Sequence, residues 1–189
     1  MARPREFDTD KVLDALQDVF WERGYEGTSY AHITAATGLK KGSLYAAFGD
    51  KRSLYLEALA KYDTGNVSDG VAMLTNTKLT GAERIGVLMQ SLVDAAETKR
   101  GRWGCLLCNA AVDQAPFDPD TQTAVLKSMT RMKLAIAKAL EGTKAANKVD
   151  TVWTLYFGGR VMIKSGASKE TLAAIKEQTL SLLLSLIHI

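Results

Sequence analysis

Apolar residues recur at intervals of three and four along most of the chain, which is the spacing of an amphipathic α-helix. In residues 9–23 the apolar stripe consists of Val12, Leu13, Leu16, Val19 and Phe20. Asp8 or Thr9 stands at the N-cap position, and Gly24 follows the last periodic residue, as at many helix C-termini. The pattern predicts a first helix over residues 9–23.

The next segment predicts two short helices joined by a tight turn. The first begins at Thr28 or Ser29 and ends near Thr37, Gly38 forms the turn, and the second covers about residues 40–47. The apolar residues spaced to close one small core are Ile33, Leu39, Leu44 and Phe48. Burying them turns the start of the second helix outward, and its exposed residues are Lys40, Lys41, Gly42, Ser43 and Tyr45.

The N-terminal part of this helix carries small, basic and hydroxyl-bearing side chains, which is typical of a helix that binds in the major groove of DNA. Gly42 costs a helix about 1 kcal/mol relative to alanine, but it lets the backbone approach a groove closely. Thr28 and Lys51 begin the flanking helices, where free N–H groups favour phosphate. A solvated lysine pair with no ligand is the plain alternative. The candidate DNA-binding residues are Thr28, Lys40, Lys41, Gly42, Ser43, Tyr45 and Lys51. Arg3 and Arg5 form a basic arm, either for a minor groove or without a role.

The remaining chain continues the helical pattern, so we predict an all-α protein of about nine helices. Asp50 caps a fourth helix, residues 64–66 indicate a kink, and residues 75–80 indicate a loop. Further helices are expected over residues 81–100, 104–114, 119–141, 147–165 and 168–187. We expect a three-helix, helix-turn-helix DNA-binding domain over residues 1–50 and a larger helical domain over residues 51–189, for which the family resemblance given below implies ligand binding and dimerisation.

Composition narrows the class of protein without naming a function. Of the 189 residues, 47% are hydrophobic and 24% charged, which is ordinary for a globular protein. The net charge of +3 is too small to argue nucleic-acid binding alone, so the basic residues matter by position. No apolar run reaches the roughly 20 residues that span a bilayer, and the N-terminus has no signal-peptide core. We expect a cytoplasmic protein with no membrane partner.

A single helix-turn-helix covers few base pairs, so specific binding requires a homodimer that presents two such units to a palindromic site. The last two predicted helices carry broad apolar faces suited to a four-helix interface, and Gly158 and Gly159 permit close helix crossing. The near-heptad stripe of the last helix consists of Leu172, Ile175, Thr179, Leu182 and Leu186, with Leu183 and Ile187 beside it. An ordinary core is the alternative.

Cys105 and Cys108 form a C-x-x-C pair without a second pair or a suitably placed histidine, so we expect no metal and no cofactor. They are either small core residues or a thiol switch, with Arg100 and Arg102 near enough in sequence to lower a thiol pKa. The middle helices supply aromatic and flexible apolar residues for an effector pocket or for a core. The tentative pocket residues are Trp103, Cys105, Leu107, Cys108, Phe117, Met129, Met132, Trp153 and Tyr156, with Leu126 nearby.

Two ordered runs, Phe20 to Ser29 and Gly42 to Lys51 with Gly38 between them, resemble the DNA-binding region of the TetR/AcrR family of bacterial transcriptional regulators. The similarity covers about residues 5–60 and continues loosely through residues 104–107 and 116–120. It implies a homodimeric repressor with a ligand-binding C-terminal domain and an apolar effector. Thr34 and Thr37 replace small apolar residues, and His32 replaces a common acidic residue, which argues against a capping box at Ser29.

We therefore expect a dimeric, non-enzymatic regulator that binds a double-stranded palindromic operator and is released by an unknown small apolar effector. One alternative keeps the fold and makes Cys105 and Cys108 a redox or electrophile sensor. A thiol oxidoreductase is a second alternative, but it lacks an acid/base pair. A helical interaction module without DNA is a third, and it leaves the exposed face from Lys40 to Tyr45 unexplained.

Overall fold

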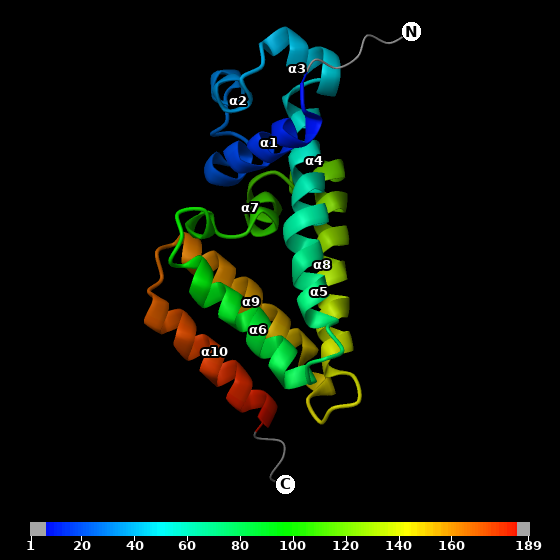
Figure 1. Cartoon of the computed structure of the whole chain (residues 1–189), viewed down its shortest axis with the longest axis vertical. Helices are drawn as coiled ribbons and strands as arrows, with labels where there is room; N and C mark the ends of the chain where they lie inside the picture. Colours follow the sequence, from blue (N-terminus) through cyan, green and yellow to red (C-terminus); the bar gives the residue numbers. More distant parts are fainter. Residues whose placement is uncertain (1–6, 185–189) are drawn as a thin grey trace.

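A computed structural model describes residues 7–184 of the chain, and the regular structure in this range is entirely helical, as the sequence predicts (Figure 1). The α-helices are α1 (Thr9–Arg23), α2 (Tyr30–Thr37), α3 (Lys41–Phe48), α4 (Lys51–Tyr62), α5 (Ser68–Leu74), α6 (Gly81–Ala95), α7 (Leu106–Asp113), α8 (Pro119–Leu140), α9 (Val149–Lys164) and α10 (Lys169–Leu184). A π turn, η1 (Asp63–Val67), and two 3₁₀ turns, η2 (Gly101–Trp103) and η3 (Ala146–Lys148), complete the order.

The helices form a small head and a larger body. Helices α1, α2 and α3 make the head at one end of the molecule, and α4, η1 and α5 run from it alongside α8 (Figure 1). Helices α9, α6 and α10 pack into a slanted layer beside this pair. The short helix α7 lies between the head and that layer, so it contacts both parts of the molecule (Figure 1).

Local sequence signals fix α1, and the predicted bounds are confirmed. The Asp8 carboxylate accepts hydrogen bonds from the backbone N–H groups of Asp10 and Lys11. Gly24 ends the helix with φ of +72°, a conformation that glycine adopts without strain. Phe20 is fully buried and meets the Tyr55 ring edge-on at 5.1 Å between centroids, which anchors α1 to α4.

The kink predicted at residues 64–66 is a π turn. Helix α4 continues through η1 into α5, with one backbone insertion instead of a break. Arg131 of α8 pairs with Asp63 and donates to the Ser68 hydroxyl at 3.1 Å, so it clamps both sides of the π turn. Helix α5 was not predicted as a separate element, because the weak periodicity around Gly65 obscured it.

The later helices are shorter than predicted. The helix expected over residues 81–100 ends at Ala95, and the one expected over 104–114 begins at Leu106. Between them Gly104 takes φ of +83°, which an α-helix does not allow. At its start, α6 carries a capping box in which Thr80 and Glu83 each bond the other's backbone N–H.

The predicted dimer stripe on α10 is wrong for Leu172 and Thr179, and for Leu183 beside it, whereas Ile175 and Leu182 are half-buried. Leu172 and Thr179 are fully buried within the subunit, and Leu183 is 5% exposed. They are covered because α10 packs along α6, where Leu180 lies over Gly86. An apolar stripe shows that a helix face needs a partner, but here that partner is in the same chain. Leu186 and Ile187 lie outside the described residues.

Of the predicted glycine pair, Gly159 is the one at a helix crossing. A Cβ atom at Gly159 would lie 2.7 Å from Cδ1 of Leu92, a fully buried side chain of α6, whereas Gly158 faces open space. We expect Gly159→Ala to lower the free energy of unfolding by about 1–3 kcal/mol, because a packed core does not absorb an extra methyl group. Urea denaturation followed by circular dichroism measures this change.

Gly86→Ala is the matched control for Gly159→Ala. Its Cβ would lie 3.7 Å from Leu180, an ordinary van der Waals contact, and the substitution removes a glycine from a helix interior. It should stabilise the protein by up to about 1 kcal/mol. Equal stability of the two variants would contradict the close crossing of α6 and α9.

Candidate DNA-binding surface and effector cavity

The turn between α2 and α3 is built by local hydrogen bonds. Gly38 adopts the left-handed conformation with φ of +70°, which closes α2 and redirects the chain. At the start of α2, Ser29 and His32 form the capping box that the sequence analysis had discounted. Ser29 Oγ accepts the His32 N–H, and His32 Nδ1 accepts the Ser29 N–H, both at 3.2 Å. A neutral imidazole nitrogen is an acceptor, so histidine replaces the usual carboxylate.

Helix α3 turns the expected residues outward, and we call them the α3 face. Leu44 is fully buried beneath them, whereas Leu39 and Phe48 are half-buried against the core. Tyr45 keeps 45% of its surface exposed. The exposed residues that form the α3 face are Lys40, Lys41, Gly42, Ser43 and Tyr45.

Tyr30, which the sequence analysis did not single out, orders this surface. Its ring stacks on Tyr45 at 5.5 Å between centroids, and Lys41 Nζ lies 4.3 Å above the Tyr30 ring. Burial and a hydrogen bond to Tyr45 raise the pKa of Tyr30 to about 12, so its hydroxyl stays protonated. The stack holds a cation and two hydroxyl groups in one place, where each can meet a phosphate.

Two flanking candidates behave differently from the α3 face. Thr28 is only 1% exposed, and its hydroxyl donates to the Gly24 carbonyl at 2.6 Å, while its N–H bonds the Tyr25 carbonyl. Both polar groups are occupied inside the protein, so the structure contradicts Thr28 as a DNA contact. Lys51 is half-buried with Nζ 4.3 Å above the Tyr25 ring. Arg3 and Arg5 lie outside the described residues.

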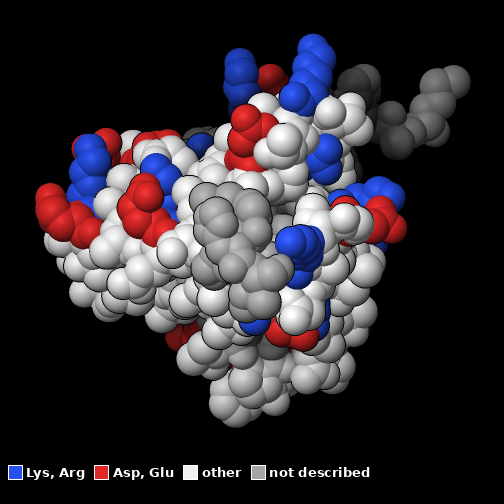
Figure 2. Space-filling model, turned by 90° about the horizontal axis from the view of Figure 1, so that it is seen from below, with Lys and Arg blue, Asp and Glu red and all other residues white. Residues whose placement is uncertain are grey.

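At the end of the molecule opposite the head, the charged side chains among residues 7–184 do not form a basic cluster like the α3 face. Viewed from below, acidic and basic side chains are interspersed over the described residues (Figure 2). This arrangement gives no extended field of one sign for a nucleic acid to follow. Any electrostatic attraction of the α3 face for a nucleic acid therefore comes from its own two lysines, Lys40 and Lys41, rather than from the net charge of the chain.

Polar contacts tie α7 to the head and the start of α8 to α4. Asp113, the last residue of α7, accepts the backbone N–H of Tyr25 at 3.0 Å. Arg52 of α4 donates to Asp118 at 2.6 Å and also pairs with Asp120, both at the start of α8. Hydrogen bonds from Thr121 and Arg52 hold the pKa of Asp118 below its usual range, so the carboxylate stays charged. The loop after α1 is therefore fastened to the end of α7, and the start of α4 to the start of α8.

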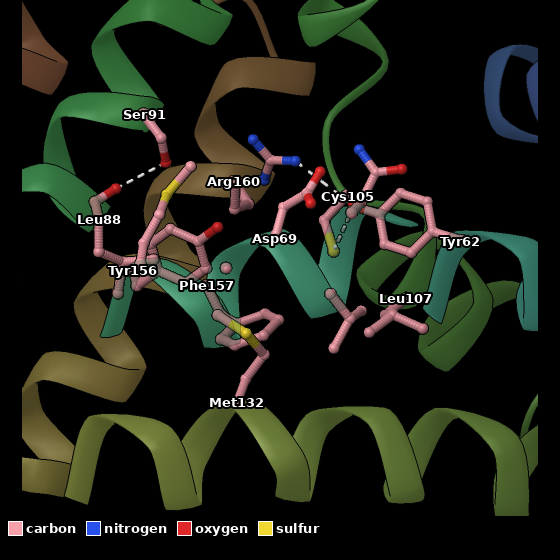
Figure 3. A pocket seen from close by; sticks show the side chains of 14 residues that line it. Tyr62, Asp69, Leu88, Ser91, Cys105, Leu107, Met132, Tyr156, Phe157 and Arg160 are labelled. Carbon is pink, nitrogen blue, oxygen red and sulfur yellow. Dashed lines mark hydrogen bonds between the residues drawn. The ribbon is translucent and has the colours of Figure 1, made fainter. Parts of the chain in front are cut away.

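A cavity of about 190 Å³ lies inside the body, where the α4–η1–α5 helix, α6, α7, α8 and α9 meet (Figure 3). Its apolar walls come from Leu88, Leu107, Met132 and Phe157. Its polar groups include Tyr62, Ser91, Tyr156 and Arg160. A cavity with one apolar wall and several converging polar groups is typical of a small-molecule site.

The predicted pocket residues divide between the cavity and other environments. Those that line the cavity are Cys105, Leu107, Met132 and Tyr156, and Cys108 is buried beside Cys105. Phe117 is 82% exposed and Leu126 57% exposed, so neither belongs to the cavity. Trp103 packs on Trp21 at 5.8 Å between centroids, and Trp153 packs on Phe157 at 4.2 Å. Met129 is half-buried outside the cavity lining.

The two cysteines have different environments. Cys105 is the N-cap of α7, and its Sγ accepts the Tyr62 hydroxyl at 3.6 Å (Figure 3). A hydrogen bond from the Cys108 thiol lowers the pKa of Cys105, with help from Arg160, and correspondingly raises the pKa of Cys108. The pair shares this titration, so the first proton leaves from the Cys105 side at a lower pH than from an ordinary thiol.

The arginine beside the thiols is not one that the sequence analysis named. Arg100 pairs with Asp18 at 2.8 Å, and Arg102 donates to the Ala167 carbonyl. Arg160 reaches the site instead from α9. Its sequence signal is the spacing on that helix, since Arg160 lies four residues after Tyr156 and three before Ile163, on the buried face.

The architecture defines a class of protein. An exposed basic second helix in a helix-turn-helix head, joined to an all-helical body with a cavity, is that of a DNA-binding regulatory protein. Comparison with known proteins agrees: a family model described as bacterial regulatory proteins, tetR family, matches residues 12–58. The described residues contain no helix with the length and apolar character required for a transmembrane span.

Individual relatives give the same answer. The HTH-type transcriptional regulator YezE of Bacillus subtilis is 35% identical to this chain in a match that covers 64% of this chain. The same match covers 61% of the length of YezE. The HTH-type transcriptional repressor ComR of Escherichia coli is 26% identical over 95% of this chain and 90% of its own length. A cysteine variant of the TetR family transcriptional regulator CifR, solved with double-strand operator DNA, superposes with a TM-score of 0.79 at 30% identity, covering 94% of this chain and 98% of CifR. This chain belongs to the TetR family of transcriptional regulators.

The reduced form of NemR from Escherichia coli shows the same fold. Its TM-score is 0.78 at 17% identity, with 91% of this chain and 95% of NemR covered. These relatives are transcriptional regulators, so the sequence-based assignment of an all-α DNA-binding regulator is confirmed.

Proposed function

We propose that the protein is a homodimeric repressor that reads a palindromic operator with helix α3 and leaves it when a small molecule fills the cavity. The observation that carries the DNA-reading role is the α3 face, where Lys41, Tyr30 and Tyr45 form an ordered, exposed cluster above the buried Leu44. Operator recognition is assigned to residues 1–50, and effector binding and dimerisation to residues 51–189. Its DNA partner places its action in the cytoplasm.

Dimerisation is assigned to the solvent side of α9 and α10. The apolar residues Val161 and Met162 of α9 are 54% and 37% exposed, although the opposite face of this helix is in the core. Covering them with a second copy places two α3 helices on one side of a pair. A dimer of this kind reads two half-sites about one helical turn of DNA apart.

Footprinting on the DNA that flanks its own gene tests this function. The expected result is protection of two inverted half-sites on one face of the duplex, lost in higher salt because the contacts neutralise phosphates. Protection of a single half-site by a monomer would remove the dimer from the proposal. Absence of any salt-dependent retention on duplex DNA would remove the repressor itself.

A thiol sensor in the same fold is the second candidate, and the position of Cys105 in the cavity wall favours it. In this case an electrophile enters the cavity and the Cys105 thiolate bonds to it. The low pKa of Cys105 means that the thiolate is present at pH values where an ordinary thiol of pKa about 8.5 is protonated.

Alkylation against pH provides the measurement for this second candidate. Iodoacetamide should modify Cys105 with a midpoint below that of a free thiol, and Cys108 only at higher pH, as followed by mass spectrometry. Arg160→Gln should move the Cys105 midpoint upward, because it removes the nearby positive charge. If operator release by electrophiles persists in Cys105→Ser with Cys108→Ser, the sensor role is excluded.

A further inference from the structure

Arg160 places a positive charge in the cavity without a carboxylate partner among residues 7–184. Its Nη2 donates to the Tyr62 hydroxyl at 3.4 Å, and its Nε is buried with no hydrogen-bond partner among residues 7–184 (Figure 3). No carboxylate in that range forms an ion pair with it. By contrast, Arg131 pairs with Asp63 and Lys133 pairs with Asp150. A buried cation that no carboxylate pairs with is costly to fold, so its presence in the cavity calls for an explanation.

The groups around Arg160 do not neutralise it by themselves. Burial raises the pKa of Tyr62 and of Tyr156, so both hydroxyls remain neutral. Cys105 is the neighbour whose ionised form Arg160 favours, and it shares its proton with Cys108. The cavity can therefore hold an anion from outside, with the Cys105 thiolate as the alternative counter-ion when the cavity is empty.

The opposite wall of the cavity is apolar. Leu88 is 1% exposed and Met132 is 3% exposed, and both face the same space as Phe157 (Figure 3). The volume of about 190 Å³ is a little larger than that of an engineered cavity of about 150 Å³ that holds benzene. The space therefore fits a ring or a branched chain of benzene size with one small polar group.

Asp69 limits the charge of the ligand. This carboxylate also lines the cavity, but its side chain is exposed, so water screens it more than it screens Arg160. A second negative charge on the ligand would add to the repulsion from the Asp69 carboxylate, which Figure 3 draws on the same side of the cavity as Arg160. One negative charge and one compact apolar part satisfy both ends of the cavity.

We propose that the cavity binds a small monocarboxylate, whose carboxylate pairs with Arg160 and whose apolar part lies against Leu88, Met132 and Phe157. This inference rests on the proposed role of the cavity as the effector site. It differs from the expectation of a wholly apolar effector, since an uncharged ligand would leave the guanidinium desolvated and without a carboxylate partner. Arg160 is suited to this role because its planar fork matches a carboxylate with two parallel hydrogen bonds.

Matched acids and amides test the inference in the full-length protein. The probes are benzoate and benzamide, phenylacetate and phenylacetamide, and 3-methylbutanoate and 3-methylbutanamide, each titrated by isothermal calorimetry. We expect at least one carboxylate to bind and to exceed its own amide by at least tenfold in affinity. Arg160→Gln should abolish that preference, whereas the surface variant Arg102→Gln should retain it.

Stability of the empty protein supplies a second measurement. In a Cys105→Ser background no thiolate can pair with Arg160. Replacing the unpaired cation by a side chain of similar size and no charge then relieves a desolvation cost, so Arg160→Met in this background should unfold at a Tm equal to or above that of Cys105→Ser alone. A clearly lower Tm would identify Arg160 as a structural residue and would count against the proposal. The same is true if no carboxylate binds, or if each amide binds as tightly as its acid.

Operator affinity is measured on the same preparations without ligand, so the two proposals fail separately. Operator binding by a protein that takes up none of the carboxylates would leave the repressor intact and overturn the carboxylate site. If the protein binds a carboxylate but does not bind the operator, the carboxylate site would stand and the repressor function would be overturned.

Discussion

Alanine at both Lys41 and Tyr45 is expected to weaken operator binding by several hundred-fold while leaving the fold intact. In the proposed dimer on its operator, the two side chains of each subunit would contribute four phosphate contacts in total. If each contact contributes a net binding free energy of about 1 kcal/mol, the loss of four contacts costs about 4 kcal/mol. Since about 1.4 kcal/mol corresponds to a tenfold change in affinity, this loss gives the expected several hundred-fold effect. Both residues are exposed, and Leu44 beneath them is not altered, so the Tm should change by only a few degrees.

Single substitutions separate charge from stacking in this cluster. Lys41→Ala should lower the slope of log affinity against log salt by about two, since each subunit loses one phosphate neutralised. Tyr45→Phe keeps the stack on Tyr30 and removes the hydroxyl, so it should retain the salt slope and lose a smaller part of the affinity. Fluorescence anisotropy with labelled operator measures both quantities.

Lys11→Ala is the control for these variants, because Lys11 is a lysine of the head with 84% of its side chain exposed and lies on α1. Its operator affinity should stay within about twofold of the wild type. If the Lys41 and Tyr45 double variant still protects the operator normally, α3 is not the reading helix.

Asp113→Ala is expected to separate effector binding from operator release. Cys105 in the cavity wall is the N-cap of helix α7, and Asp113 at the other end of α7 accepts the backbone N–H of Tyr25 at 3.0 Å. Without that acceptor, a shift of α7 no longer pulls on the loop between α1 and α2. Since coupling between two sites is typically 1–3 kcal/mol, the ratio of operator affinities without and with effector should fall by about tenfold or more.

Thermal shift with the best-binding ligand and operator anisotropy together measure this coupling. Ligand affinity should remain near the wild-type value in Asp113→Ala, because Asp113 lies outside the cavity lining. Asp150→Ala, which removes an exposed carboxylate paired with Lys133, should leave the coupling unchanged. Normal release of the operator from Asp113→Ala would assign transmission to another contact, such as Arg52 with Asp118.

The head was predictable because its signals are local. Asp8, Gly24, Gly38 and Asp50 mark helix ends through their own backbone preferences, and the buried Leu44 determines which residues of α3 face outward. The position of Tyr30 beside Tyr45 depends on the angle between α2 and α3. Sequence spacing within a single helix does not contain that angle.

The cavity was less predictable because it depends on contacts between distant segments. Arg160 of α9 meets Tyr62 of α4 and lies near Cys105 only in the folded protein, because the three residues are far apart in the sequence. The apolar stripe of α10 correctly indicates a covered face, but whether its cover is α6 or another subunit is a tertiary question. Thr28 shows the same limit, since a hydroxyl at a helix start can turn inward to a carbonyl as well as outward to a phosphate.

The π turn at Asp63–Val67 determines in which direction around the helix axis the side chains of α5 point. An α-helix advances by about 100° per residue, so loss of one residue from the turn would swing Gly70 away from Met132, whose Sδ lies within 3.0 Å of a Cβ built there. The head and its reading helix would keep their shape, while the cavity wall would present a different set of side chains. A change of one residue in length at this point thus offers a route to a new chemical specificity over an unchanged operator.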